Sequence, residues 1–211
     1  MTDLVGDEDG ETRLTPDELA KLIPGHIRTR GELDELEAEN IRHAITWLAR
    51  RRRRNPLSIN FMRELHRHMY GEVWRWAGQF SLEYHRPLGV DANQTEPELR
   101  VLIDDCHFWI EDGSFPDPSE LLATFHHRLT RIHPFPNGNG RWARLMTDVL
   151  AEQIDASAIS WGGVTPESAL HHAGTVERVI YIEALRAADG HDLRPLNDLI
   201  RTWSTSSEEL P

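Results

Sequence analysis

Residues 132–146 read IHPFPNGNGRWARLM, and this stretch joins two segments that both show the apolar spacing of a buried helix. The earlier segment opens with Asp117 and Pro118, an N-cap residue followed by the residue favoured at the first helical position. Apolar residues recur every three or four positions on both sides: Leu121, Leu122, Phe125, Leu129 and Ile132 before the turn, and Leu145, Met146, Val149 and Leu150 after it. The sequence therefore predicts two packed helices joined by a glycine-rich turn.

Helical periodicity also dominates the rest of the chain, in residues 14–23, 32–53, 58–70, 99–110, 165–190 and 193–203. Residues 76–94 differ, because Phe80, Leu82 and Tyr84 alternate with polar residues as in a strand. A hairpin is unstable alone, so it should lie against the helices. We expect an all-α domain with one short β-hairpin flap. Residues 13–203 should form this single domain, between a disordered acidic tail at 1–12 and a second disordered tail at 204–211.

The charge balance makes nucleic acid an unlikely partner, because the net charge of −12 would repel phosphates over most of the surface. The exception is Arg50–Arg54, five consecutive arginines. The ordinary interpretation is a solvated helix end, where cations favour the helix dipole. A partner surface is the alternative.

Cysteine and hydropathy patterns point to the cytoplasm. The single cysteine, Cys106, excludes an internal disulfide and a Cys-based zinc site. No basic, apolar leader opens the sequence, and no apolar run reaches the ~20 residues that span a bilayer, so no membrane association is expected. The twelve histidines lack the spacing of a zinc helix.

The central turn carries residues suited to phosphate chemistry. Gly138, Asn139 and Gly140 would open a helix whose backbone N–H groups an anion can approach closely. Arg141 and Arg144 are three residues apart and so share one helix face. His133, at the end of the preceding helix, could accept a proton from a nucleophile. Each feature alone is common in structural turns, but the full spacing indicates a di- or triphosphate site beside a general base.

This set resembles the signature of the Fic (Fido) family, His-x-Phe-x-(Asp/Glu)-Gly-Asn-Gly-Arg-x-x-Arg, over residues 133–144. The chain looks most like the short bacterial members called mobile mystery protein B, with the family core at about 30–190. The resemblance implies a protein adenylyltransferase that uses ATP as substrate and moves AMP to a Ser, Thr or Tyr hydroxyl of a target protein. It implies that His133 is the base, that Arg141 and Arg144 hold the outer phosphates, and that a flap near residues 79–88 docks the target backbone.

One position departs from the family signature, which has Asp or Glu where this chain has Asn137. In the family that carboxylate binds Mg²⁺. An amide oxygen can coordinate a hard cation but adds no charge, so we expect a weak Mg²⁺ site or a preference for Mn²⁺.

A second feature that the resemblance implies is an inhibitory helix. Many family members have an inhibitory helix whose Glu pairs with the second motif arginine, and "ELEAEN" offers Glu39 for that role, with Glu37 within one turn. An ordinary charged helix face explains the same residues.

Two other functions also stay open: transfer of a phosphoryl or other phosphate-linked group on the same fold, and a non-catalytic nucleotide-binding regulatory module. The sequence leaves the oligomeric state and the target open.

Overall fold

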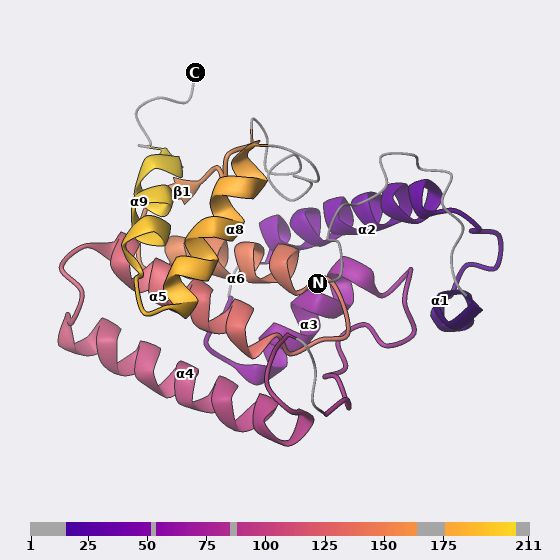
Figure 1. The fold of residues 1–211 in the computed structure, drawn as a ribbon, viewed down its shortest axis with the longest axis horizontal. Coiled ribbons are helices and arrows are strands. Elements are labelled where there is room, and N and C mark those ends of the chain that lie inside the picture. Colours follow the sequence, from indigo (N-terminus) through magenta and orange to yellow (C-terminus); the bar gives the residue numbers. More distant parts are fainter. Residues whose placement is uncertain (1–15, 52–53, 85–87, 164–175, 206–211) are drawn as a thin grey trace.

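The computed structural model describes residues 16–51, 54–84, 88–163 and 176–205. These residues form mostly helices, which confirms the all-α class (Figure 1). The elements in chain order are α1 (Pro16–Lys21), α2 (Arg30–Arg50), α3 (Ile59–Tyr70), α4 (Ala92–Asp112), α5 (Pro118–Ile132), α6 (Asn139–Gln153), β1 (Ala158–Ile159), α8 (Val176–Asp189), α9 (Arg194–Trp203) and β2 (Ser204–Thr205).

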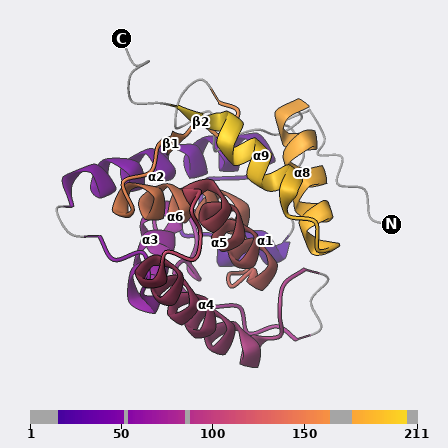
Figure 2. The same cartoon turned by 90° about the vertical axis from the view of Figure 1, so that its left-hand side faces the viewer.

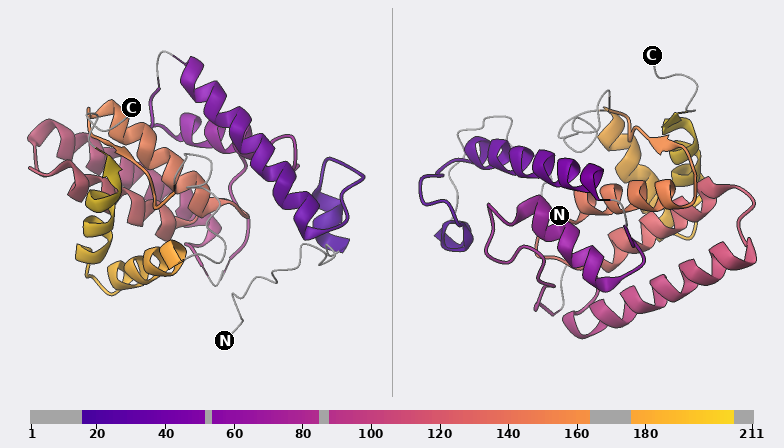
Figure 3. Two further views of the ribbon diagram at one scale, coloured as in Figure 1. Left: turned by 90° about the horizontal axis from the view of Figure 1, so that it is seen from above. Right: turned by 180° about the vertical axis from the view of Figure 1, so that it is seen from behind.

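The two central helices, α5 and α6, pack against each other, and the glycine-rich turn connects them. Helix α5 also packs on α4, α8 and α9, while α6 contacts α3, which in turn packs on α2 (Figures 1 and 2). Seen from above, α2 lies on one side of α6, and α8 and α9 lie on the other (Figure 3). Helix α6, which follows the turn, is therefore flanked by helices from both ends of the chain.

Local signals set most helix ends. Asp117 caps α5 by accepting a hydrogen bond from the Ser119 N–H (2.9 Å), with Pro118 at the first position. Ser58 caps α3 in the same way, through the Phe61 N–H (3.2 Å). Thr29 caps α2 with a capping box, so the helix begins at Arg30, two residues earlier than the periodicity alone predicts. Residues 14–15 and 165–175, with which two of the expected helices begin, lie outside the described residues.

Aromatic residues fill the core around the turn. The largest fully buried side chains are Trp142, Trp161, Tyr70, Phe125 and Phe135. Burial of such large rings contributes strongly to folding. Cys106 is buried too, and burial raises the pKa of its thiol to about 12. Within the part of the chain that the structure describes, no helix is long and apolar enough to cross a membrane.

The flap segment differs from the expected hairpin. Residues 79–84 and 88–91 contain no strand, while 85–87 lie outside the described residues. The backbone instead bonds to the turn that follows α5: the Ser81 N–H donates to the Pro134 carbonyl (2.9 Å) and the Val90 N–H to the Ile132 carbonyl (3.2 Å). The N–H groups of Ser81 and Val90 are therefore not available to pair the two arms of the expected hairpin, because they bond to carbonyls on either side of His133.

The one described strand pair lies elsewhere, where β2 pairs antiparallel with β1. Ser204 and Thr205 are therefore ordered into β2, although they were expected to begin a tail. Residues 206–211 and the expected acidic tail at 1–12 lie outside the described residues.

The arginine run lies at the end of α2, as the helix-end interpretation predicts. Helix α2 ends at Arg50. Arg51 forms an ion pair with Glu64 (2.9 Å) and lies 4.9 Å from the centre of the Trp47 ring. Arg54 pairs with Glu152 of α6. These two arginines therefore bind the protein itself, while residues 52–53 lie outside the described ranges.

Candidate active site

The turn between α5 and α6 is held in one conformation by two residues in the left-handed region. His133 (φ 51°, ψ 58°) ends α5, and Gly138 (φ 78°, ψ 3°) immediately precedes α6. For a residue with a side chain, this conformation is uncommon and often marks a functional site. The two reversals turn the chain sharply, so that the end of α5 faces the start of α6.

Gly138 is required by space as well as by conformation. A Cβ built on Gly138 would lie 2.5 Å from Cζ of Tyr70, a fully buried ring of α3. Gly140 differs, because a Cβ there would meet nothing within 4 Å. The first helical bond of α6 runs from the Trp142 N–H to the Gly138 carbonyl (3.0 Å). The backbone N–H groups of residues 139–141 precede that ladder and can face an anion.

The Asn139 side chain supports the loop and does not offer its amide to an anion. Its Oδ1 accepts from the Phe135 N–H (2.8 Å), and its Nδ2 donates to the Phe135 carbonyl (2.8 Å). The side chain is only 2% exposed. A buried amide with both ends paired fixes the shape of the turn, so any anion contact at this position falls to the backbone N–H.

Asn137 is likewise turned into the loop. Its Oδ1 accepts from the Gly138 N–H at 2.7 Å. No group of three or more His, Cys, Asp or Glu residues that could hold a metal occurs in the described ranges. At position 137 the protein therefore offers a divalent ion only a neutral oxygen that already accepts a hydrogen bond, which fits at most a weak metal site.

His66 of α3 is a buried support for this loop that sequence reasoning missed. The Gly78 N–H donates to its Nδ1 (3.0 Å), so the proton is on Nε2, which lies 3.1 Å from the Asn137 carbonyl. Its ring stacks on Phe135 with centroids 3.7 Å apart. Burial lowers the pKa of His66 to about 3, so the ring is neutral and links the base of the flap to the loop.

His133 is half-buried beside the flap. A Cβ on Gly89 would lie 2.8 Å from Cβ of His133, so the flap backbone packs directly on this residue. Its Nδ1 lies 3.4 Å from the Thr130 carbonyl. A proton on Nδ1 that donates to this carbonyl leaves the lone pair on Nε2, which is then the basic nitrogen.

Arg141 is paired with a buried carboxylate. Its Nη2 donates to Glu37 Oε2 (2.5 Å), while the Trp74 indole N–H donates to Glu37 Oε1 (2.7 Å). The guanidinium also lies 5.3 Å from the centre of the Tyr70 ring. Burial alone would lower the pKa of Arg141, but Tyr70 and Glu37 outweigh burial and raise that pKa. Arg141 is thus a fixed cation at the start of α6.

Arg144 lies one turn further along α6 and is only 4% exposed. Its guanidinium lies 5.4 Å from the centre of the Tyr181 ring of α8. Burial lowers the pKa of Arg144, and the nearby cations Arg141 and Arg178 add to that effect. The two motif arginines therefore rest on tyrosine rings from different parts of the chain.

Glu39 does not reach the site, so its predicted pairing with Arg144 is wrong. It lies on the surface, where it forms ion pairs with Arg42 and His43. Two residues along a helix turn a side chain by about 200°, so Glu37 and Glu39 point in nearly opposite directions. Glu37 faces the site, and it contacts the first motif arginine.

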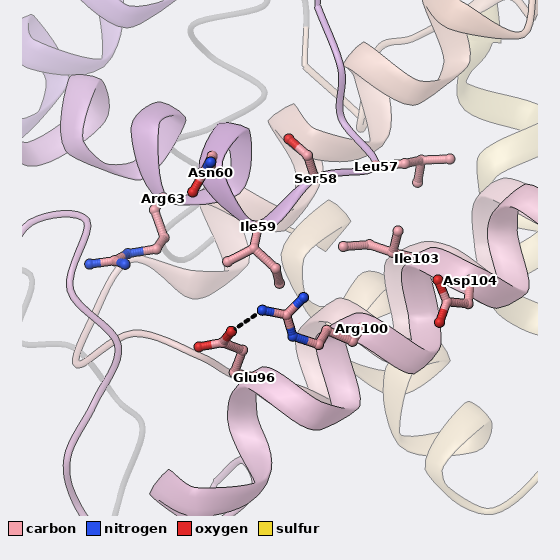
Figure 4. Close-up of a pocket in the computed structure, with 9 residues that line it drawn as sticks. All are labelled: Leu57, Ser58, Ile59, Asn60, Arg63, Glu96, Arg100, Ile103 and Asp104. Carbon is pink, nitrogen blue, oxygen red and sulfur yellow. Dashed lines mark hydrogen bonds and ion pairs between the residues drawn. The ribbon is translucent and has the colours of Figure 1, made fainter.

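The site residues that sequence reasoning missed are Tyr70, Tyr181 and His66. Helical spacing marked apolar stripes as core, and these three belong to such buried surfaces. No local pattern shows which buried ring will lie under an arginine from another helix. One surface hollow, of about 430 Å³, lies between the start of α3 and α4, and none of its lining residues comes from the α5–α6 turn (Figure 4).

Known proteins resemble this chain in sequence and in fold. The Fic/DOC family profile matches residues 56–151. Protein adenylyltransferase Fic from Drosophila virilis is 26% identical over 144 residues, which covers 66% of this chain and 27% of that protein. This chain thus spans about a quarter of the length of that relative.

Two solved structures have a similar fold. The N-terminal Fic domain of a VirB-translocated effector from Bartonella quintana is 19% identical, with a TM-score of 0.68 and 89% of each chain covered. BepC from Bartonella tribocorum with bound AMPPNP is 18% identical, with a TM-score of 0.68 and coverage of 94% and 95%.

Proposed function

The Fic/DOC family profile matches residues 56–151, and from that match we propose that this chain transfers AMP from ATP to a Ser, Thr or Tyr hydroxyl of a target protein. The observation that carries the proposal is the turn itself: a histidine at the end of α5, a sharp glycine turn, and two arginines on the first turns of α6. The relative from Drosophila virilis, named a protein adenylyltransferase, supports it. Membership of the mobile mystery protein B subgroup stays a prediction from the sequence.

The proposed chemistry follows from these residues. The N–H groups at the start of α6, with Arg141 and Arg144, hold the outer phosphates of ATP and so place the α-phosphorus beside His133. Nε2 of His133 takes the proton of the target hydroxyl as its oxygen bonds to that phosphorus. The bond between the α-phosphorus and the bridging oxygen breaks, and pyrophosphate leaves. The protein thus contributes mainly positioning and charge stabilisation.

The flap is the proposed docking site for the target protein. Its side chains Leu82, Tyr84 and Leu88 are 87%, 57% and 62% exposed. The flap is anchored on both sides of His133 through the Pro134 and Ile132 carbonyls. A target backbone that adds to this segment by strand pairing would therefore bring its hydroxyl next to the base.

Labelled ATP tests the proposed reaction. The purified chain is incubated with ATP labelled on the α- or the γ-phosphate, and label on protein is measured together with released pyrophosphate. AMP transfer predicts protein label from the α-position only. Label from the γ-position would indicate phosphoryl transfer. Bound ATP with no transferred label would indicate the non-catalytic regulatory module.

Asn137→Asp should reduce the metal requirement of transfer. The wild-type amide adds no charge toward a divalent ion and bonds to Gly138, so we expect wild-type activity to need roughly millimolar Mg²⁺ or to prefer Mn²⁺. A carboxylate at 137 should lower the half-saturating metal concentration by about tenfold and raise the rate. The measurement is α-label transfer across Mg²⁺ and Mn²⁺ titrations for both proteins. Superimposable curves would show that residue 137 does not contact the metal ion.

Glu37→Gln should raise AMP transfer several-fold, because Glu37 neutralises Arg141 in the resting protein. We propose that this ion pair restrains the enzyme, since an arginine bound to a carboxylate holds a phosphate less strongly. Glutamine keeps an oxygen for the Trp74 N–H, and it replaces the charged oxygen that accepts from Arg141 with a neutral NH₂ group. The rate of α-label incorporation is the measurement.

Glu39→Gln is the matched control, because Glu39 lies on the same helix but pairs only with surface residues. Its rate should equal that of the wild type. Removing one partner of a buried ion pair also destabilises the fold, by about 3–5 kcal/mol. Because the phosphates of bound ATP would give Arg141 a new negative partner, ATP should raise the unfolding temperature more for Glu37→Gln than for wild type. Equal rates in wild type and Glu37→Gln would make the ion pair purely structural.

A further inference from the structure

Tyr181 lies outside the region matched by the family profile, yet it contacts the proposed nucleotide site. It is on α8 and is 5% exposed. The guanidinium of Arg144 lies 5.4 Å from its ring centre, within the range of a cation–π contact. Helix α8 therefore brings an aromatic face to an arginine that the α5–α6 turn places near the phosphates.

A buried hydrogen-bond chain fixes the orientation of this ring. The Thr147 hydroxyl donates to the Ala143 carbonyl (2.8 Å), so its oxygen must accept from Nδ1–H of His126 (3.0 Å). Nε2 of His126 then carries the lone pair and accepts from the Tyr181 hydroxyl (2.8 Å). One chain of bonds thus ties α8 through α5 to the backbone of α6, one residue before Arg144.

His126 acts in this chain as a neutral spacer. It is fully buried, and burial lowers its pKa to about 3, with the charge of Arg144 adding to the effect. The Trp161 ring packs on both His126 (centroids 4.6 Å apart) and Tyr181 (6.4 Å, edge to face). The tyrosine ring is therefore held by its hydroxyl and by the perpendicular Trp161 ring, which leaves little freedom for its face to tilt away from Arg144.

The two motif arginines are supported in different ways. Glu37 supports Arg141 with a negative charge, which offsets the positive charge offered to a phosphate. The ring of Tyr181 attracts Arg144 through its quadrupole and adds no negative charge of its own. A neutral support suits a cation whose role is to bind an anion.

We propose that Tyr181 is a positioning residue for the nucleotide: it holds Arg144 toward the outer phosphates and couples α8 to the active site. This inference rests on the proposed function, in which Arg144 binds those phosphates. In this role Tyr181 acts through Arg144 and not through a contact of its own with the substrate.

The test is ATP affinity, measured by calorimetry, together with KM and kcat for α-label transfer. Tyr181→Met fills the space without an aromatic face, so the Kd and KM for ATP should rise about tenfold while kcat changes less than threefold. Tyr181→Phe keeps the face and loses the bond to His126, so its Kd should stay within about twofold of wild type even if its unfolding temperature falls. A Tyr181→Met variant with wild-type affinity would overturn the proposal.

A double-mutant cycle separates positioning from general structural support. Arg144→Ala should weaken ATP binding, and Tyr181→Met should add nothing in that background, because its effect acts through Arg144. If the losses of ATP affinity in the two single variants multiply in the double variant, the proposal is overturned. If Tyr181→Met does not fold, phenylalanines with increasing fluorination at position 181 replace it, since they keep the ring's shape and weaken its quadrupole. Affinity should then fall stepwise with fluorine content, and a constant affinity would refute the role.

Failure of the proposed function gives a different result. A wild-type protein that binds ATP but transfers no α-label would refute AMP transfer, while the affinity cycle would still decide the role of Tyr181. A wild-type protein that does not bind ATP would refute both.

Discussion

His133→Ala should abolish AMP transfer while leaving ATP binding nearly unchanged. General-base catalysis contributes about 10²–10⁴-fold to such reactions, so the expected loss of rate is of that order. His133 ends α5 in the left-handed conformation, and its Nδ1 faces the Thr130 carbonyl, which leaves Nε2 as the basic nitrogen. The phosphate contacts come from α6 and stay intact in the variant. The measurement is α-label transfer together with ATP affinity by calorimetry.

His107→Ala is the matched control, because His107 is an exposed histidine on α4. It should transfer label at the wild-type rate. Alanine at 133 still has to adopt a positive φ, so circular dichroism should first establish that both variants fold. Transfer by His133→Ala at the wild-type rate would show that another group takes the proton.

Gly138→Ala should destabilise the protein and remove nucleotide binding. The backbone has φ +78°, which costs a residue with a Cβ about 1–2 kcal/mol. The new methyl group would also lie 2.5 Å from Tyr70, and overpacking of this kind costs about 1–3 kcal/mol. The expected loss in free energy of unfolding is therefore roughly 2–5 kcal/mol. Because Tyr70 also lies under Arg141, a shift of its ring should disturb the phosphate site as well.

Gly140→Ala is the comparison for stability. It lies two residues away, in α6, and an added Cβ would meet nothing within 4 Å. Its free energy of unfolding, measured in urea, should equal that of the wild type or slightly exceed it, since alanine favours the helix. Equal stability of both variants would mean that Tyr70 does not confine Gly138.

The relation between Glu37 and Tyr181 suggests how the site is balanced. One motif arginine is neutralised by a carboxylate from α2, and the other is held by a neutral ring from α8. Charge removal at 37 and loss of the aromatic face at 181 should therefore have opposite effects, with the first raising transfer and the second weakening ATP binding.

Local chemistry was sufficient for the elements around the site. Asp117 with Pro118 predicted the start of α5, and the glycines predicted the turn before α6, because capping and positive φ depend on neighbouring residues alone. The positions of His133, Arg141 and Arg144 on either side of this turn follow from the same local rules. The all-α class follows from apolar spacing along nearly the whole chain.

Only the tertiary structure decided the partners of these residues. Glu39 and Glu37 are equivalent in the sequence, and the packing of α2 on α3 selects Glu37 for the site. Asn139 has the composition of an anion ligand, but the fold uses its amide to bind Phe135. The flap has the alternating pattern of a strand, but its backbone bonds through Ser81 and Val90 to the turn after α5. Each outcome depends on contacts between residues distant in sequence. Helical periodicity reports which face of a helix is buried but not which residue of another helix it meets.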